Sequence, residues 1–412
     1  MTQTAPPHPH TPTVPHLPSA FRTLLAGEAV SAAGSQFTLI AVPFLAATEL
    51  DASASQLALL SGAQFLPALL VTPIAGKLAD LHDRAPLLYL SHLARFALLV
   101  AVIVLAELGG LDYWTLFAAS MLLGAGTALF DTALLAYVPD TVEPAELTKA
   151  NGQLAVVYAV AQSAGPAAGG LLVSGLGPVL ALGVDALSYA GGGAALRLRR
   201  RPARHKAARG AARIRDGFTE VLRNDPLRRL VSAGTLFNLA EQVALSVLFV
   251  AVVREADRSV ALIGFGFSAA GLGSVAGAWA SRRFGGGDGD RSWVWALALS
   301  QAALLAALWS FTWVRHGEPL FLATMLVYGL AIAFYNVHSL TRRQKLAPEG
   351  MLGRVNAVYR TLAYGSIPVG SALAALLVTV TTAPVAAAVA APLSLLATAI
   401  LARGTYTTGN AE

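Results

Sequence analysis

The sequence predicts an all-α integral membrane protein with twelve transmembrane helices, arranged as two six-helix halves related by pseudo-symmetry. Three observations predict this fold class. Only 13% of the 412 residues are charged and 55% are hydrophobic, whereas soluble domains contain about 25% charged residues. The apolar residues form twelve runs, each long enough to cross a bilayer. One long basic segment divides these runs into two sets of six.

Each apolar run is expected to be one helix. Backbone polar groups in lipid must be satisfied within their own segment, and the strict alternation of an outer-membrane strand is absent. The predicted spans are 22–47, 55–76, 87–107, 113–138, 150–174, 178–196, 229–252, 259–281, 292–314, 319–341, 353–379 and 384–402.

The two ends of the chain have no apolar run. The first twenty residues hold six prolines and three histidines, whereas a signal peptide has a basic segment followed directly by an apolar one. We therefore expect residues 1–20 to be a disordered cytoplasmic tail, and residues 404–412 a second tail. The alternative for the histidines is metal binding, but a flexible tail is favoured.

Lys and Arg are distributed very unevenly between the loops. If both termini are cytoplasmic, 24 of the 29 basic residues lie on the cytoplasmic side, and only Arg254, Arg258 and Arg315 lie on the other. The positive-inside rule therefore predicts cytoplasmic termini. This distribution also explains the net charge of +6 as a topology signal that contacts anionic lipid, so nucleic-acid binding is disfavoured.

The longest polar segment, 198–228, separates a predicted N-terminal half, 21–197, from a predicted C-terminal half, 229–403. Within this segment, residues 213–224 have apolar side chains at helical spacing, which predicts an amphipathic helix on the inner membrane surface. These side chains are Ile214, Phe218, Val221 and Leu222.

The two halves resemble each other weakly. Asn151 opens the fifth span and is followed by Pro166, while Asn356 opens the eleventh and is followed by Pro368. Duplicated six-helix halves place a substrate site at their interface near the bilayer midplane. The pattern therefore indicates a transporter rather than a channel or a membrane enzyme.

The loop between the second and third spans, GKLADLHDR at 76–84, resembles the signature loop of the major facilitator superfamily. By this resemblance, Gly76 allows close helix approach, and Asp80 and Arg84 contact helix ends. Together they would form a charged clasp that breaks and reforms as the halves rock. The alternative is a simple polar turn, and Leu81 stands where the family often has a basic residue.

Two further segments, 213–231 and 342–371, resemble the drug- and siderophore-export branch of this superfamily, which includes enterobactin exporters and macrolide efflux proteins. A third, GPAAGG at 165–170, resembles the antiporter motif. Its Gly165, Pro166, Gly169 and Gly170 imply a kinked helix that controls leak and direction, or else simple close packing. The resemblance covers residues 20–403 and implies the major facilitator fold and alternating access. Gly34 is followed by Ser35 where many relatives have Asp.

Six ionisable residues fall inside the predicted spans, where each costs about 2.5–3.5 kcal/mol on insertion scales. Four of them, Glu28, Arg95, Asp131 and Arg360, are expected at one depth near the cytoplasmic side. At that depth a structural ion-pair network is favoured over a substrate site. Asp131 could instead pair with Arg84, and Asp185 has no evident partner. The six are Glu28, Arg95, Asp131, Asp185, Glu241 and Arg360.

Glu241 lies near the middle of the seventh span and shares a helix face with Asn238 and Gln242. Because desolvation disfavours a charged carboxylate, Glu241 is the leading candidate for proton coupling, followed by Glu28 and Asp131. The alternative is a carboxyl group that is hydrogen-bonded to a neighbouring helix.

Polar and aromatic side chains in the seventh, tenth and eleventh spans predict a cavity for an amphipathic substrate. Some of them could be interfacial anchors instead. The cavity candidates are Asn238, Gln242, Tyr335, Asn336, Arg360 and Tyr364.

The glycine-rich stretch 271–277 lies inside an apolar run, so it lacks the strand that a dinucleotide fingerprint requires. Gly273 and Gly277 instead predict close helix packing. The histidines lack zinc-ligand spacing, cysteine is absent, and there is no P-loop lysine motif. We therefore predict no cofactor, no metal site and no use of ATP.

These observations and the resemblance together predict a monomeric, proton-coupled exporter in the bacterial inner membrane. Its partners would be protons, the lipid bilayer and a hydrophobic or amphipathic small molecule, such as an antibiotic or siderophore. The alternatives are an uptake symporter for a nutrient and, less favoured, a membrane-embedded enzyme or a non-transporting receptor. The sequence does not identify the substrate.

Overall fold

The computed structural model describes residues 17–143, 146–197, 214–254, 260–284, 290–314, 316–348 and 351–404. Within these residues, twelve helical segments are long and apolar enough to cross a membrane, one for each predicted run. The all-α fold class with twelve spans is therefore confirmed. Most of the two predicted tails and the first part of the predicted linker lie outside the described residues.

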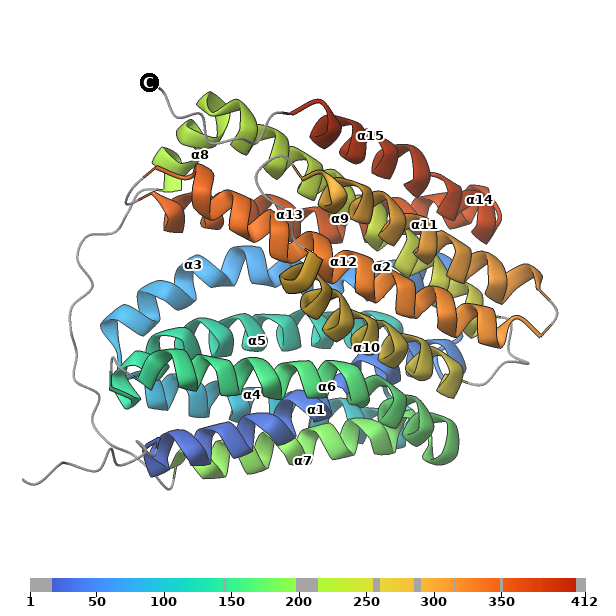
Figure 1. Ribbon diagram of the computed structural model, residues 1–412. Coiled ribbons are helices and arrows are strands. Elements are labelled where there is room, and N and C mark those ends of the chain that lie inside the picture. The colour runs from blue at the N-terminus through green and yellow to red at the C-terminus, as the bar shows by residue number, and fades with distance from the viewer. Residues whose placement is uncertain are drawn as a thin grey trace, which may run out of the picture.

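The chain forms two groups of helices, coloured blue to green and yellow-green to red in Figure 1. The N-terminal half contains α1 (Ser19–Thr48), α2 (Ala54–Ala63), α3 (Phe65–Leu81), α4 (Arg84–Glu107), α5 (Tyr113–Thr141), α6 (Leu147–Leu176) and α7 (Pro178–Arg197). The C-terminal half contains α9 (Asp225–Arg254), α10 (Val260–Phe284), α11 (Ser292–Trp313), α12 (Glu318–Leu346), α13 (Leu352–Val380), α14 (Ala383–Ala388) and α15 (Ala390–Ala402).

Two spans are each broken into a pair of helices. The breaks fall at Gln64, between α2 and α3, and at Val389, between α14 and α15. Pro67 and Pro392 follow three residues later. Because proline has no N–H, neither can donate to the carbonyl four residues earlier, where the preceding helix ends. The helix α5 packs against the first break, since a Cβ at Gly124 would collide with the Gln64 carbonyl.

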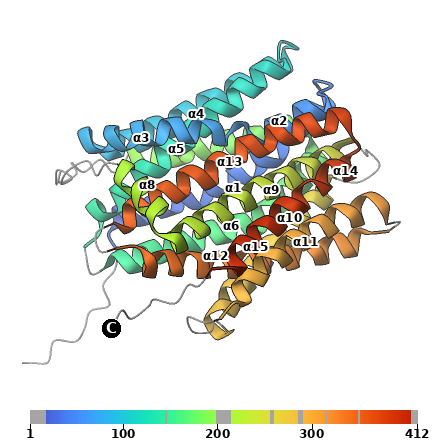
Figure 2. The same ribbon diagram turned by 90° about the horizontal axis from the view of Figure 1, so that it is seen from above.

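The short helix α8 (Ile214–Arg223) occupies the predicted amphipathic segment. Val221 is buried in a small apolar cluster with residues of α9 and α13, whereas Leu222 is exposed. Asp216 forms an ion pair of 3.6 Å with Arg354, at the start of α13. The helix α8 is therefore docked on the C-terminal half, at the end of α13 seen in Figure 2.

The bundle has two ends. We call the end where α1 begins and α15 finishes the terminal face, and the other end the opposite face. Near the opposite face, one apolar core contains residues from both halves, such as Leu57 and Val247. Near the terminal face, each half has its own core, around Phe130 in the first half and Trp293 in the second. The halves therefore pack together at the opposite face and diverge toward the terminal face.

Glycines allow this close packing where α6 crosses α10. A Cβ at Gly170 would lie 3.1 Å from the Cα atoms of Ala261 and Gly264, and one at Gly264 would collide with the Pro166 carbonyl. Within the second half, Gly273 and Gly277 lie against the α12 backbone at Leu326 and Leu330. The packing interpretation of these two glycines is confirmed.

Candidate functional site

A cavity of about 340 Å³ lies between the two halves. Helices α1 and α6 form one wall and α10 and α12 the other. The polar groups of the lining are the side chains of Gln36, Gln162, Ser274 and Tyr328, and the apolar part includes Phe267. A cavity with mostly apolar walls and a few convergent polar groups is typical of a small-molecule site.

Glu241 is connected to this cavity through Tyr328. The Tyr328 hydroxyl, on α12, donates a hydrogen bond of 2.6 Å to Glu241 Oε1, on α9. Tyr328 also lines the cavity, so one side chain contacts the carboxyl group and borders the cavity. Sequence inspection missed Tyr328 because the helix period does not identify the neighbouring helix.

The two residues predicted to share a face with Glu241 make different contacts. Asn238 Nδ2 donates to the Gly234 carbonyl of its own helix at 2.7 Å. Gln242 Nε2 donates to the hydroxyls of Ser61 on α2, at 3.2 Å, and Ser371 on α13, at 2.9 Å. Gln242 is therefore part of a hydrogen-bonded cluster between the halves, away from the lining of the cavity.

The predicted cavity residues on α12 and α13 do not share one site: one is buried, two are exposed, and one lies beside an aromatic ring. Tyr335 is only 1% exposed and stacks on Trp293 at 6.0 Å between ring centroids. Its assignment to a cavity is wrong, because its side of α12 faces the core of the C-terminal half. Asn336 and Tyr364 are exposed. Arg360 lies 5.8 Å from the Tyr364 ring centroid.

The charges of the N-terminal half lie around Arg95. Its guanidinium lies 4.8 Å and 4.3 Å from the ring centroids of Phe130 and Tyr189, and its Nη2 donates to His92 Nδ1 at 3.3 Å. Asp131 is exposed and interacts electrostatically with both Arg95 and Arg360. Among the described residues, the predicted network of direct ion pairs is absent, since aromatic rings occupy the contact distance around Arg95.

Glu28 is buried on α1 and accepts a hydrogen bond of 2.8 Å from the Tyr158 hydroxyl on α6. Its second carboxyl oxygen, Oε2, is also buried and has no hydrogen-bond partner among the described residues. Glu28 and Glu241 are therefore both carboxyl groups that accept a hydrogen bond from a tyrosine on another helix. The signal that could have indicated Tyr158 is its polar hydroxyl within an apolar span.

Asp185, whose role the sequence left open, is fully buried and has two local donors. The Thr38 hydroxyl donates at 2.5 Å and the Ser188 hydroxyl at 3.0 Å. Gly34 packs against this site, since a Cβ there would lie 2.6 Å from Asp185 Oδ1. Ser35, where relatives often have Asp, is hydrogen-bonded to the Tyr189 hydroxyl at 2.9 Å. These contacts join α1 to α7.

Of the contacts expected for the predicted clasp, the structure shows one, and the role of the clasp in rocking stays a prediction. Arg84 forms a buried ion pair with Asp140 near the end of α5, and its Nε donates to the Ala79 carbonyl at 3.1 Å. The alternative pairing of Arg84 with Asp131 is therefore wrong. The role proposed for Gly76 is also wrong, because a Cβ there would meet no atom within 4 Å. The side chain of Asp80 is outside the described part of the structure.

The antiporter-like segment of α6 contacts both halves. Gly165 and Gly169 pack on Gln36 and Phe37 of α1. One residue beyond Pro166, the N–H of Ala167 donates to the hydroxyl of Ser268 on α10 at 2.9 Å. Proline in α6 interrupts the regular hydrogen bonding there, and a side chain of the other half satisfies one of the backbone groups.

Gln36, Gln162 and Phe267 are among the uncharged residues of the cavity that sequence inspection missed. It searched the spans mainly for ionisable groups, although a primary amide inside a span is also costly unless it finds a partner or water. The amide side chains of Gln36 and Gln162 could therefore have indicated that α1 and α6 line a cavity.

The comparison with known proteins agrees with this architecture. A model of the Major Facilitator Superfamily matches residues 24–371. An uncharacterized MFS-type transporter, y4rN of Sinorhizobium fredii (strain NBRC 101917 / NGR234), is 26% identical over 371 residues, which cover 88% of this chain and 89% of the relative. The multidrug efflux pump Tap of Mycolicibacterium fortuitum is 28% identical over 385 residues, covering 86% and 87%.

Solved structures share the fold at lower identity. A bacterial homologue of the iron transporter ferroportin, in an inward-facing state, superposes with a TM-score of 0.72 at 18% identity and covers 95% of this chain and 99% of its own. The nucleoside transporter NupG superposes with a TM-score of 0.69 at 12% identity, covering 94% and 100%. With twelve spans, a cavity between two halves and a family model across most of its length, the chain belongs to the Major Facilitator Superfamily, and it is a multi-pass membrane transporter of small molecules rather than an enzyme.

Proposed function

We propose that this transporter is a proton-coupled exporter of a hydrophobic or amphipathic small molecule in a bacterial inner membrane. The observation that carries the proposal is the hydrogen bond from Tyr328 to Glu241 at the wall of the cavity between the halves. It connects a carboxyl group deep in the bundle directly to the space that a substrate would occupy. The likeness to Tap, which is named a multidrug efflux pump, supports export as the direction.

The basic residues support a topology with both termini in the cytoplasm, because those in the described part of the chain are concentrated at the terminal face. In this orientation, the halves diverge toward the cytoplasm and pack together toward the outside. The conformation would be the one in which an exporter accepts its substrate. Rocking of residues 21–197 against residues 229–403, connected through the segment 198–228, would then expose the cavity to the other side.

The cavity lining supports an amphipathic substrate. Phe267 and Pro166 offer apolar surface, while Gln36 and Gln162 offer amide donors and acceptors. Substrate binding beside Tyr328 would compete with its hydrogen bond to Glu241. A carboxyl group that loses this donor has a changed proton affinity, because hydrogen bonding to the charged form favours that form. Competition of this kind would link the occupancy of the cavity to the protonation of Glu241, with Glu28 and Asp131 as further proton-binding candidates.

The proposal is tested with the purified chain in proteoliposomes that carry an imposed pH gradient. The probes are ethidium, tetracycline and erythromycin, and the internal dye pyranine reports proton movement. We expect at least one probe to accumulate against its gradient while protons move the opposite way. Liposomes without a pH gradient are the control. Movement of probe and proton in the same direction would instead support the uptake symporter.

A further inference from the structure

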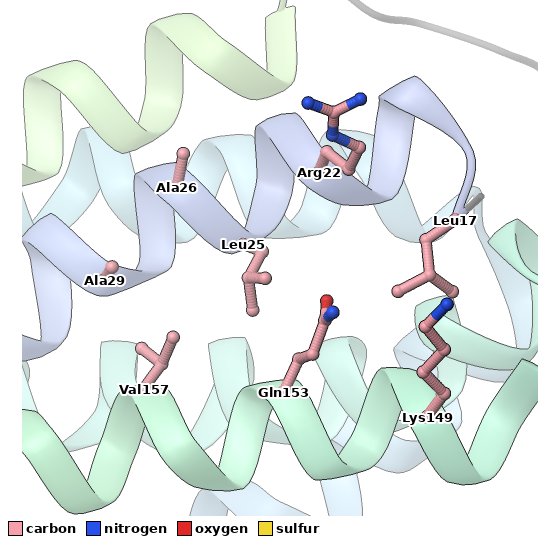
Figure 3. Close-up of a pocket in the computed structure, with 8 residues that line it drawn as sticks. All are labelled: Leu17, Arg22, Leu25, Ala26, Ala29, Lys149, Gln153 and Val157. Atoms are coloured by element: carbon pink, nitrogen blue, oxygen red, sulfur yellow. The ribbon is translucent and has the colours of Figure 1, made fainter.

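A second, separate groove of about 610 Å³ lies on the N-terminal half, between α1 and α6 (Figure 3). It shares no lining residue with the cavity between the halves. Both helices are membrane spans, and the groove occupies the part of each span next to the terminal face. Its volume is in the range of small-molecule sites, about 300–1,000 Å³.

The chemistry of the groove changes with depth. Arg22 and Lys149 lie three and two residues from the starts of α1 and α6, whereas Ala29 and Val157 each lie ten residues from those starts. At about 1.5 Å per residue, the apolar pair is roughly 11 Å deeper in the bilayer than the basic pair. Gln153 lies between the two levels. The groove is therefore basic at the membrane surface and apolar toward the membrane interior.

Several of the lining side chains extend into the space between α1 and α6. In Figure 3, Lys149 and Gln153 extend from α6 toward α1, and Leu25 extends from α1 into the same space. Arg22 extends from α1 on the side away from α6, so the two cations lie on either side of the first turns of α1. The alanines on α1 leave the deep part of the groove unfilled.

We propose that this groove binds one phospholipid with an anionic headgroup. The phosphate lies at the level of Arg22 and Lys149, the glycerol region lies beside Gln153, and one acyl chain follows the apolar floor. The polarity gradient runs along the membrane normal in the same order as in a lipid molecule. A free inorganic anion would contact only the basic end of the groove, whereas a phospholipid would contact both the basic end and the apolar end.

The expected consequence concerns the two helices that the lipid separates. Helix α1 contributes Gln36 to the cavity and α6 contributes Gln162 and the Pro166 segment that contacts α10. A lipid bound between the first turns of these helices would stabilise the spacing that they have at the terminal face. Lipid binding is measured directly, so the test does not depend on the transported substrate.

The test uses native mass spectrometry of the full chain released from vesicles of equal parts phosphatidylglycerol and phosphatidylcholine. Two variants are compared with the wild type: Arg22→Ala with Lys149→Ala, which removes the charges, and Ala29→Trp, which fills the apolar end. The matched controls are Arg282→Ala with Arg283→Ala, two exposed bases at the same face, and Val30→Trp, an exposed position outside the groove.

We expect the wild type to retain one phosphatidylglycerol in preference to phosphatidylcholine. Each basic side chain near an anionic surface contributes about a fivefold preference, so the charge variant should lose roughly 25-fold in occupancy. Ala29→Trp should lose retention of the lipid without any change in charge, and both controls should match the wild type. Equal retention by the wild type and the groove variants, or equal retention of the two lipids by the wild type, would overturn the proposal.

Discussion

Tyr328 and Glu241 are joined by a hydrogen bond of 2.6 Å across the α9–α12 interface, and only the tyrosine lines the cavity between the halves. The Tyr328 side chain therefore lies between the carboxyl group and the cavity and contacts both. This relationship gives each of the two side chains a distinct expected phenotype.

Replacing Glu241 with Gln keeps the shape of the side chain and an acceptor for Tyr328, but removes the ability to bind and release a proton. We expect Glu241→Gln to lose proton-driven accumulation of the probe and to retain downhill exchange. Tyr328→Phe should weaken coupling without abolishing it, since the carboxyl remains. Pyranine fluorescence in proteoliposomes measures both effects, with Glu220→Gln on α8 as the matched control. Full coupling in Glu241→Gln would remove Glu241 from the mechanism.

The pair formed by Glu28 and Tyr158 is expected to control stability. Tyr158→Phe leaves a buried carboxyl oxygen without its donor, which costs about 1–3 kcal/mol. Glu28→Gln combined with Tyr158→Phe should recover part of this loss, because an amide is less costly to bury than a charge. Thermal unfolding in detergent measures the cycle. Equal losses in the single and double variants would show that the hydrogen bond contributes little.

The contact between Gly264 and the Pro166 carbonyl is expected to hold the opposite face closed. A methyl group at position 264 collides with this carbonyl, so Gly264→Ala should shift the population toward a state open at that face. The chain has no cysteine, so a single Phe267→Cys reports access to the cavity. A membrane-impermeant maleimide added outside should label this cysteine faster in Gly264→Ala.

The matched control for this experiment is Gly183→Ala, because a Cβ at Gly183 meets no atom within 4 Å. Labelling should be unchanged in the control. Identical labelling rates in Gly264→Ala and Gly183→Ala would show that the α6–α10 contact does not limit opening.

The ion pair between Arg84 and Asp140 connects the start of α4 to the end of α5. Because both side chains are largely buried, Arg84→Ala should destabilise the protein by up to about 3 kcal/mol by leaving the carboxylate unpaired. Asp140→Ala should have a similar effect, and the double variant should be less destabilised than the sum of the two. Chemical denaturation measures the three variants, with Arg282→Ala as the exposed control. Strict additivity would show that the pair is energetically uncoupled.

Asp112 caps the first turn of α5, where it accepts a hydrogen bond of 2.9 Å from the Thr115 N–H. This backbone hydrogen bond lowers the pKa of the Asp112 carboxyl below its usual value. The cap should therefore stabilise the fold fully above the usual pKa of Asp and lose its charged contribution as the pH falls through the lowered value. The Tm difference between wild type and Asp112→Ala should shrink over that range. Asp112→Asn, which caps without titrating, should show no such trend relative to Asp112→Ala.

The sequence predicted most of the fold because hydropathy is a property of each segment alone. The breaks in the second and twelfth spans were not predicted, although Pro67 and Pro392 were visible in the sequence. The error at Tyr335 has a different origin. A polar aromatic residue in a span can face a cavity or a core, and only the rotation of α12 against Trp293 decides between them.

The candidate site was predicted less completely than the fold. Glu241 and Glu28 were identified because a carboxyl group in an apolar span is rare and costly. Their partners Tyr328 and Tyr158 were not, since each lies on a helix far away in the sequence. The same limit applied to Arg84, for which Asp131 was proposed as a partner and Asp140 is the observed one.

The sequence by itself determined the number of spans, the unequal distribution of basic residues and the few charges inside the membrane, because the bilayer acts on each segment separately. The tertiary structure alone decided which helices are neighbours, and therefore which tyrosine contacts each carboxyl group and which residues line the cavity and the groove. The helical period places a side chain on one face of its own helix. The identity of the helix opposite that face depends on how all twelve spans pack.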